Sequence, residues 1–176
     1  MSLATSTFAG IVELGVSASY KKSNIDNDNF TLENSTSLTV SYYYGEMSAI
    51  EYSYTEGVRR NSYKPTGGET QITTNYSTLH GLDLVFSFAG RSSAFQPFIK
   101  AGAAILSKKN FYKTESLSEQ ETPGFSGTVP SVGLGFRVKV TSATSIKAGI
   151  DAWSVDEDKD ISQWDNAARI GVTWLF

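Results

Sequence analysis

The sequence of 176 residues contains no cysteine and a single histidine. Without cysteine there is no disulfide framework, no thiolate metal site and no cysteine nucleophile. The formal net charge is -3 and no long basic run occurs, so nothing in the charge pattern points to nucleic acid. The sequence also lacks any stretch near the ~18 apolar residues that a membrane-spanning helix requires. Any contact with a membrane would therefore have to come from strands.

The first residues do not read as a signal peptide. Met1 to Leu3 are followed by a polar run at 4–7, where a signal peptide would have a basic and then an apolar segment. Two interpretations remain: a cytosolic protein, or a mature envelope protein whose first Met replaces a removed signal. The rest of the sequence favours the second, with one domain over residues 1–176.

What the sequence has throughout is an alternation of apolar and polar residues with a period of two. In the first such segment Val12 and Leu14 fall on one face, and Glu13 and Gly15 fall on the other. This period is typical of β-strands, and no convincing amphipathic helix interrupts it. The alternation predicts strands at about 8–20, 32–44, 47–58, 74–88, 95–106, 129–140, 145–155 and 164–176.

The segments between these strands alternate in length. Short connections lie at 45–46, 89–94 and 141–144, whereas the segments 21–31, 59–73, 107–127 and 156–163 are longer and polar. Short turns at one end and long loops at the other are the pattern of an outer-membrane barrel, and closure removes exposed sheet edges. We therefore expect an all-β, closed, eight-stranded antiparallel transmembrane barrel of up-and-down topology. Both termini would be periplasmic.

Three features indicate which face meets lipid. The apolar face carries no charge in the strand centres, as expected where a charge facing lipid costs ~2–4 kcal/mol. The polar face is rich in Gly, Ser and Ala, which suits the narrow interior of an eight-stranded barrel. The alternative is a soluble barrel or sandwich, whose apolar face is turned inward. The third feature is the position of the aromatic residues, which lie near the strand ends and predict two girdles. The periplasmic girdle would contain Phe8, Tyr42, Tyr44, Phe86, Phe88, Phe95, Trp174 and Phe176, and the outer one Tyr20, Tyr76 and Trp164.

The polar face also carries acids and bases. Five of them lie at similar distances from the turn ends, and because desolvated charges must be paired we expect Glu13, Glu51 and Asp83 to pair with Lys100 and Arg137. We interpret the whole set as a plug that fills a polar lumen, and a gated or ion-selective path is the alternative. The predicted lumen network comprises Glu13, Glu51, Asp83, Lys100, Arg137, Lys139, Lys147, Asp151, Asp165 and Arg169.

Few residues suggest chemistry. The only histidine, His80, falls by parity on the lipid side near the outer interface, without the serine two residues away that barrel deacylases of the lipid A-modifying type use. The carboxylate pairs Glu119/Glu121 and Asp156/Asp158 lie in predicted loops, where solvated side chains or weak Ca²⁺ contacts are expected. We therefore expect no catalytic site, no resident metal and no cofactor.

The predicted last strand carries a recognisable pattern. Ile170, Val172, Trp174 and Phe176 place apolar or aromatic residues at every second position and end on a terminal Phe. This resembles the C-terminal signature read by the outer-membrane insertion machinery. The whole chain is similar in pattern to small barrels of the OmpX and OmpA transmembrane-domain type. It ends at Phe176 without the peptidoglycan-binding domain of full-length OmpA-type proteins, so the resemblance does not imply anchoring to the cell wall.

The functional expectation follows from this resemblance. It implies a non-enzymatic protein of a Gram-negative-type outer membrane, without an open pore, that supports membrane integrity or surface interaction through four loops. We expect contacts with outer-membrane lipids and lipopolysaccharide, the insertion machinery and an extracellular ligand, no nucleic acid, and a monomer. Two alternatives remain: a narrow channel or transporter for small or apolar molecules, and a lipid A-modifying barrel enzyme.

Overall fold

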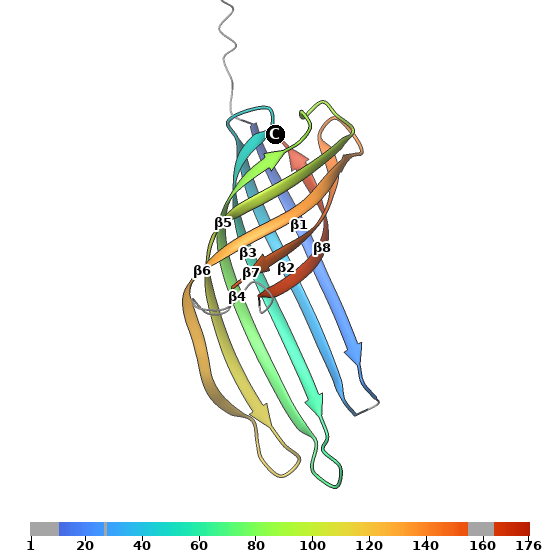
Figure 1. The fold of residues 1–176 in the computed structure, drawn as a ribbon, viewed down its shortest axis with the longest axis vertical. Helices are drawn as coiled ribbons and strands as arrows, with labels where there is room; N and C mark the ends of the chain where they lie inside the picture. The colour runs from blue at the N-terminus through green and yellow to red at the C-terminus, as the bar shows by residue number, and fades with distance from the viewer. Residues whose placement is uncertain (1–10, 27, 155–163) are drawn as a thin grey trace, which may run out of the picture.

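The structure, a computed structural model, describes residues 11–26, 28–154 and 164–176. Each strand pairs antiparallel with the next, and the last pairs with the first, so the sheet closes into a barrel (Figure 1). The predicted fold class is confirmed. Among the described residues, no helix is long and apolar enough to cross a membrane. The strands are β1 (Ile11–Asn24), β2 (Phe30–Tyr43), β3 (Ser48–Tyr63), β4 (Gln71–Ser87), β5 (Phe95–Lys113), β6 (Gln120–Lys139), β7 (Thr144–Trp153) and β8 (Asp165–Leu175).

The two ends of the barrel differ. One end, called the turn end here, holds the short connections 44–47, 88–94 and 140–143 together with the C-terminus (Figure 1). The opposite end, called the hairpin end, holds the connections 25–29, 64–70 and 114–119. The predicted connection at 156–163, and Phe8, lie outside the described residues.

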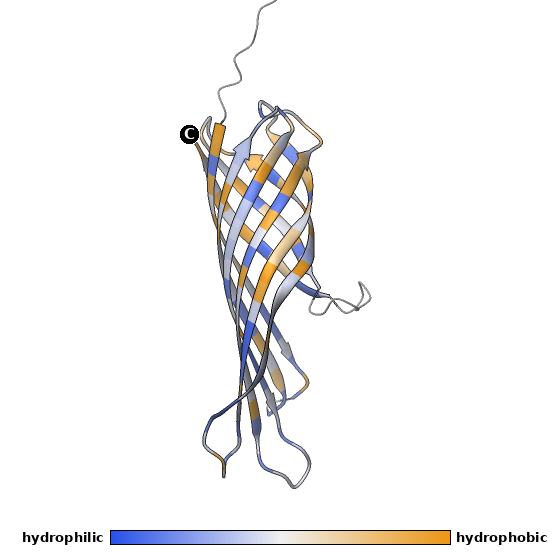
Figure 2. Cartoon of the chain, turned by 90° about the vertical axis from the view of Figure 1, so that its left-hand side faces the viewer, coloured by the Kyte–Doolittle hydropathy of each residue, from blue (hydrophilic) through white to orange (hydrophobic). Residues whose placement is uncertain are grey.

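The outer surface near the turn end is a band of large apolar side chains. Leu82, Leu134 and Ile170 are 59%, 60% and 64% exposed. In Figure 2 hydrophobic residues alternate with hydrophilic ones along the strands in the half near the turn end, whereas the half toward the hairpin end is largely hydrophilic. A continuous exposed apolar band of this kind is what contact with lipid chains requires. The soluble-barrel alternative, which needs the opposite orientation of the faces, does not fit.

The lumen is not uniformly polar, which corrects the sequence prediction. Two clusters of buried apolar side chains lie on either side of the central charges. Val85 and Phe98 lie on the inward face of their strands, together with the charged residues. The sequence analysis assigned each face by the majority of its residues, so it missed these two apolar side chains. Side chains fill the interior of an eight-stranded barrel, and apolar ones fill it without needing hydrogen-bond partners. The cluster near the turn end contains Tyr43, Ala49, Val85 and Phe98, and the cluster toward the hairpin end contains Leu79, Ala104, Leu106 and Val129.

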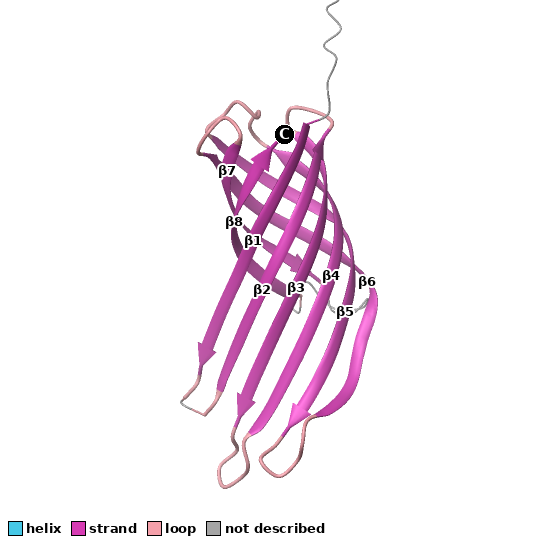
Figure 3. Cartoon of the chain, turned by 180° about the vertical axis from the view of Figure 1, so that it is seen from behind, coloured by secondary structure: helices cyan, strands magenta, loops and turns pink. Residues whose placement is uncertain are grey.

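Six strands are longer than predicted. Residues 21–24, 30–31, 59–63, 71–73, 107–113 and 120–127 lie in strands, although the sequence analysis assigned them to loops. The pairing of β1 with β8 ends at Ala18–Ile170, and that of β6 with β7 begins at Ser131–Trp153. Beyond these points β1 to β6 continue without β7 and β8 (Figure 3). We call residues 19–24, 30–35, 57–63, 71–77, 108–113 and 120–125 the protruding sheet.

Candidate functional site

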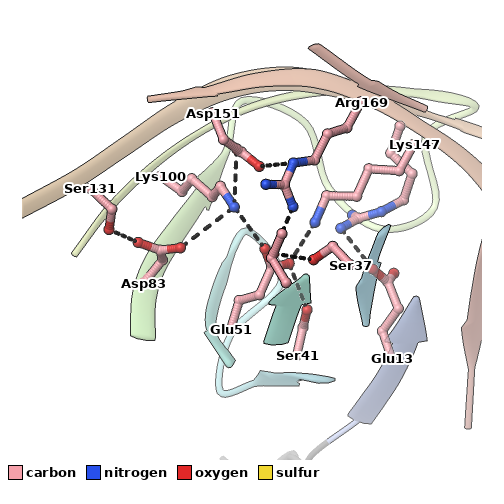
Figure 4. Close-up of polar contacts among 12 residues, drawn as sticks. Glu13, Ser37, Ser41, Glu51, Asp83, Lys100, Ser131, Lys147, Asp151 and Arg169 are labelled. Carbon is pink, nitrogen blue, oxygen red and sulfur yellow. Dashed lines mark hydrogen bonds and ion pairs between the residues drawn. The ribbon is translucent and has the colours of Figure 1, made fainter. Parts of the chain in front are cut away.

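The centre of the lumen holds a cluster of charges around Glu51 (Figure 4). Glu51, on β3, has no exposed surface. Its carboxylate accepts from Lys100 Nζ at 3.2 Å, from Lys147 Nζ at 2.5 Å and from Ser41 Oγ at 2.9 Å. These donors come from β5, β7 and β2, because inward parity on each strand aims them at the same point. One carboxylate therefore joins strands on opposite sides of the barrel.

Lys100 extends this cluster to further acids. Its ammonium also lies 3.5 Å from Asp83 Oδ2 and 3.1 Å from Asp151 Oδ1, and Asp151 Oδ2 lies 3.4 Å from Arg169 Nε. Three carboxylates thus face three cations. A buried charge is tolerated when its partners and hydrogen bonds are complete, so the six residues form a balanced unit. We call Glu51, Asp83, Lys100, Lys147, Asp151 and Arg169 the central cluster.

Glu13 and Arg137 form a separate pair nearer the turn end. Arg137 Nη2 lies 3.0 Å from Glu13 Oε1, and Arg137 Nη1 donates to Gln96 Oε1 at 3.0 Å. The Tyr43 hydroxyl donates to Glu13 at 3.2 Å. The five residues expected in one layer are all buried. Glu13 and Arg137 form this pair, and the other three are joined by the contacts of Lys100 with Glu51 and Asp83.

Two members of the predicted network lie away from the centre. Lys139 Nζ donates to the carbonyl oxygen of Arg91 at 3.3 Å, at the turn end. Asp165 contacts Lys108 at 2.5 Å and Arg59 at 3.6 Å, toward the hairpin end. Both therefore lie at other heights than the charges around Glu51, because strands that tilt around a barrel place residues of equal parity at different heights.

The group around Asp165 contains residues that the sequence analysis missed. Arg59 also lies 3.3 Å from Glu33 Oε2, so Glu33, Arg59, Lys108 and Asp165 form a second charged group, called the mouth group here. Arg59 and Lys108 had been placed in long loops, where parity was not applied. Counting by twos from Glu51 reaches Arg59, and from Lys100 it reaches Lys108, so longer strands would have revealed them.

The central cluster is closely packed but not sealed against water. A cavity of about 30 Å³ lies beside it, lined in part by Gly15, Gly149 and Gly171, which is room for two or three waters at roughly 10–15 Å³ each. A Cβ on Gly133 would lie 2.7 Å from Cε of Lys100. Glycine is needed there because a larger residue would displace the Lys100 side chain. The arrangement can therefore close the lumen.

His80 lies on the outer face of β4, exposed, as parity predicted. Its Nδ1 is 2.9 Å from the Tyr52 hydroxyl, and its ring centroid is 5.0 Å from that of Tyr54. The neighbouring acid, Glu56, accepts from the Tyr54 hydroxyl. This acid is bonded to a tyrosine rather than oriented on the histidine, so the geometry does not resemble a nucleophile–base–acid relay.

No metal-binding arrangement of three or more His, Asp or Glu side chains occurs in residues 11–26, 28–154 and 164–176. Glu119 lies in the connection 114–119 as predicted, whereas Glu121 lies in β6, so its assignment to a loop was wrong. Asp156 and Asp158 lie outside the described residues.

The terminal signature residues occupy the outer surface of β8 and the end of the chain. Ile170, Trp174 and Phe176 are exposed there, and Val172 pairs with Val16. The Phe176 amide donates to the Val12 carbonyl at 2.8 Å, so the last residue closes the barrel seam. Recognition by the insertion machinery stays a prediction. The other girdle residues exposed on the outside are Tyr20, Tyr42, Tyr44, Tyr76, Phe86, Phe88 and Phe95, and Trp164 is half-buried.

Comparisons with known proteins agree with this architecture. A family model described as the outer membrane protein beta-barrel domain matches residues 1–176. No curated protein sequence matches the chain. Among solved structures, the N-terminal β-barrel domain of OprF from Pseudomonas aeruginosa superposes with a TM-score of 0.61 at 16% identity, covering 95% of this chain and 97% of that one.

Two further barrels are similar. Neisserial surface protein A has a TM-score of 0.60 at 16% identity over 94% of this chain and 97% of that one. Ail, the attachment invasion locus protein of Yersinia pestis, has a TM-score of 0.51 at 13% identity over 95% and 97%. At identities this low, the likeness to these structures supports the fold alone. The family is shown by the family model, which covers the whole sequence. The chain therefore belongs to the outer membrane β-barrel protein family and is embedded in the bacterial outer membrane.

Proposed function

We propose that the protein is a non-enzymatic scaffold that holds the protruding sheet outside the cell, where the sheet contacts an external ligand. The observation that carries this proposal is the continuation of six strands beyond the point where β7 and β8 end (Figure 3). A barrel that only filled the membrane would not need this sheet. The turn end, where β1 begins and β8 ends, then faces the periplasm, as short turns do in bacterial barrels.

Contacts between the hairpins make the protruding sheet one unit. The amide of Lys64 donates to Asn29 Oδ1 at 2.8 Å, and Ser62 Oγ donates to the carbonyl of Asp28 at 2.9 Å. These bonds fix the connection between β1 and β2 onto β3. A surface held in place before binding loses less conformational entropy when a ligand arrives.

A second contact joins the other two hairpins reciprocally. Thr70 Oγ1 donates to Glu115 Oε1 at 2.9 Å, and Ser116 Oγ donates to Glu69 Oε2 at 2.7 Å. The backbone amides of Thr70 and Ser116 also donate to the carboxylates of Glu115 and Glu69, respectively. We call these four residues the loop clasp. It supports a surface built for contact, because free loops would need neither pair.

The orientation can be tested by labelling, since the chain contains no cysteine of its own. Thr66→Cys lies at the hairpin end and Ser92→Cys at the turn end, and both positions are exposed. A membrane-impermeant maleimide applied to intact cells should label the first variant, and the second only after lysis. The reverse pattern would overturn the proposed orientation.

The role of the protruding sheet can be tested with a shortened variant. Replacing 22–32, 60–74 and 109–124 each by Asn-Gly keeps the partner pairs Lys21–Glu33, Arg59–Asn75 and Lys108–Phe125 next to tight turns. Ail was solved in complex with the heparin analogue sucrose octasulfate, so a sulfated saccharide is the first probe. Proteoliposomes with the full chain should bind it at least ~10-fold more tightly than the shortened variant, a difference of about 1.4 kcal/mol. Equal binding by both would remove the sheet from the proposed function.

A further inference from the structure

The charged groups along the lumen differ in how their charges balance. In the central cluster three acids face three cations, and in the mouth group two acids face two cations. A small cavity at the turn end, called the turn-end chamber here, is lined by Glu13 and Arg137 and also by Arg91 and Lys139. One acid there faces three cations, so this chamber has an excess of positive charge that the other two groups do not have.

No second carboxylate offsets this excess in the described part of the chain. Lys139 takes part in no ion pair of the described residues, and its ammonium donates to the carbonyl oxygen of Arg91 at 3.3 Å. Glu46, the acid of the connection 44–47, is exposed and does not line the chamber. Residues 1–10, which lead into β1, contain no Asp or Glu. An anion from solution would supply the missing negative charge.

Contacts among the lining residues hold the cations in place. Gln96 is buried, and it accepts from Arg137 Nη1 at 3.0 Å and donates to the carbonyl oxygen of Arg91 at 3.1 Å. The guanidinium groups of Arg91 and Arg137 both lie over the ring of Tyr43, 5.5 and 5.6 Å from its centroid. These contacts join the connection 88–94 to the strands around it. Donors that are already ordered lose less conformational entropy when an anion binds.

The size of the chamber limits what the anion can be. Arg137 is 3% exposed, yet its Nε makes no hydrogen bond within the described residues, and a buried donor of this kind is normally satisfied by water or an ion. The chamber offers about 20 Å³, which is room for one or two waters at roughly 10–15 Å³ each. A monatomic anion fits this space, whereas a phosphate, with four oxygens around its phosphorus, does not.

We propose that the turn-end chamber binds a single chloride ion, held by the ammonium of Lys139 and the guanidinium groups of Arg91 and Arg137. Hydrogen bonds from charged donors are roughly twice as strong as those between neutral groups, and the ion reduces the excess of positive charge. It lies on the turn-end side of the apolar cluster that includes Phe98, outside the blocked centre of the lumen. The site does not depend on the proposed function, because nothing in it requires a particular end of the barrel to lie outside the cell.

Urea unfolding in zwitterionic lipid vesicles tests the site when chloride replaces gluconate stepwise at constant ionic strength. Gluconate has the same charge but is too large for the chamber, so screening by salt stays constant while the ligand changes. A ligand that binds only the folded state stabilises it once its concentration exceeds the dissociation constant. The urea midpoint of the unmodified chain should therefore rise with chloride. A midpoint that stays the same at every chloride concentration overturns the proposal.

Matched variants show whether the response to chloride comes from the chamber. Lys139→Gln should need at least ~10-fold more chloride for the same rise in midpoint, because a charge-assisted contact is lost. Lys113→Gln is the control, since it removes an exposed cation at the hairpin end, and it should respond as the unmodified chain does. Arg91→Gln, in the connection 88–94, should weaken the response in the same direction and takes the place of Lys139→Gln if that variant does not refold. Equal responses of the chamber variant and the control overturn the proposal.

Diffraction from crystals grown with bromide, which scatters X-rays anomalously, locates the ion directly. An anomalous peak should lie among Arg91, Arg137 and Lys139 in the unmodified chain and in the control. At the same bromide concentration it should be absent from Lys139→Gln. Peaks confined to the outer surface of the barrel overturn the proposal. A peak in the chamber without a chloride-dependent urea midpoint marks an adventitious ion only and overturns it as well.

Discussion

Glu51 is the residue on which the central cluster depends most. It has no exposed surface, and its partners are Lys100 on β5 and Lys147 on β7, which lies across the barrel from β3. Lys100 keeps two other acids, but Lys147 has no second acid among the ion pairs of the described residues. Removing the Glu51 charge would leave the largely buried Lys147 ammonium without its acidic partner, which is the expensive way to break an ion pair.

We therefore predict that Glu51→Gln leaves the fold intact but lowers the free energy of unfolding by about 3–5 kcal/mol, with part recovered if water enters the adjacent cavity. Urea unfolding of protein refolded into lipid vesicles, followed by tryptophan fluorescence, measures this change. Glu46→Gln, in the exposed turn 44–47, is the matched control and should change little. If both variants unfold at the same urea concentration, the central cluster does not stabilise the barrel.

At the scale of single elements, β8 combines two tasks. It closes the sheet against β1, and it carries the alternating residues Ile170, Val172, Trp174 and Phe176 on one face. We predict that Trp174→Asp, or deletion of Phe176, reduces insertion in cells more than it reduces refolding in detergent. Surface accumulation of each variant is compared with its strand content by circular dichroism. Normal accumulation of both would count against a recognition role for this pattern.

The loop clasp gives a pH-dependent contact outside the membrane. Hydrogen bonds from the side chain and then the backbone amide of Ser116 hold the pKa of Glu69 below its ordinary value of 4.5. Because the folded-state pKa is depressed, the clasp contributes fully above that ordinary value and is lost as pH falls through the lower folded-state pKa. We predict that the Ser116 amide exchanges faster with solvent as pH drops through this window, after correction for intrinsic exchange. Glu69→Gln should abolish this dependence, and an unchanged slope in that variant would assign it to another group.

The elements differ in how well the sequence predicts them. Strands near the turn end were predicted to within a few residues, because one face meets lipid and the other the lumen. In the protruding sheet both faces meet water or polar groups, so the alternation that marks a strand fades and residues 59–63 and 107–113 look like loop. The charges of the central cluster were identified by parity. Their heights were predicted less well, since the stagger between strands is set by barrel closure. This is why Glu13 and Arg137 form a separate pair, although one layer with Glu51, Asp83 and Lys100 was expected.

For the whole molecule, the lumen is blocked by three barriers in series. An ion entering from the turn end meets the apolar cluster that includes Phe98, then the central cluster, and then the apolar cluster that includes Leu106. The space beside the charges is about 30 Å³, too little for a hydrated ion. This arrangement opposes the channel alternative, because each apolar layer would strip the ion of water without supplying ligands.

We therefore predict that the unmodified protein in a planar bilayer shows no steady conductance. Leu106→Ala truncates the most deeply buried side chain of one apolar cluster and should destabilise the barrel by ~2–5 kcal/mol. It should still not conduct, because the central cluster and the Phe98 layer remain closed. Phe98→Ala/Lys100→Ala/Leu106→Ala thins all three barriers, and if it refolds to a heat-modifiable band it should pass small ions. Large, stable currents from the unmodified chain would show that the charges line a path rather than fill it.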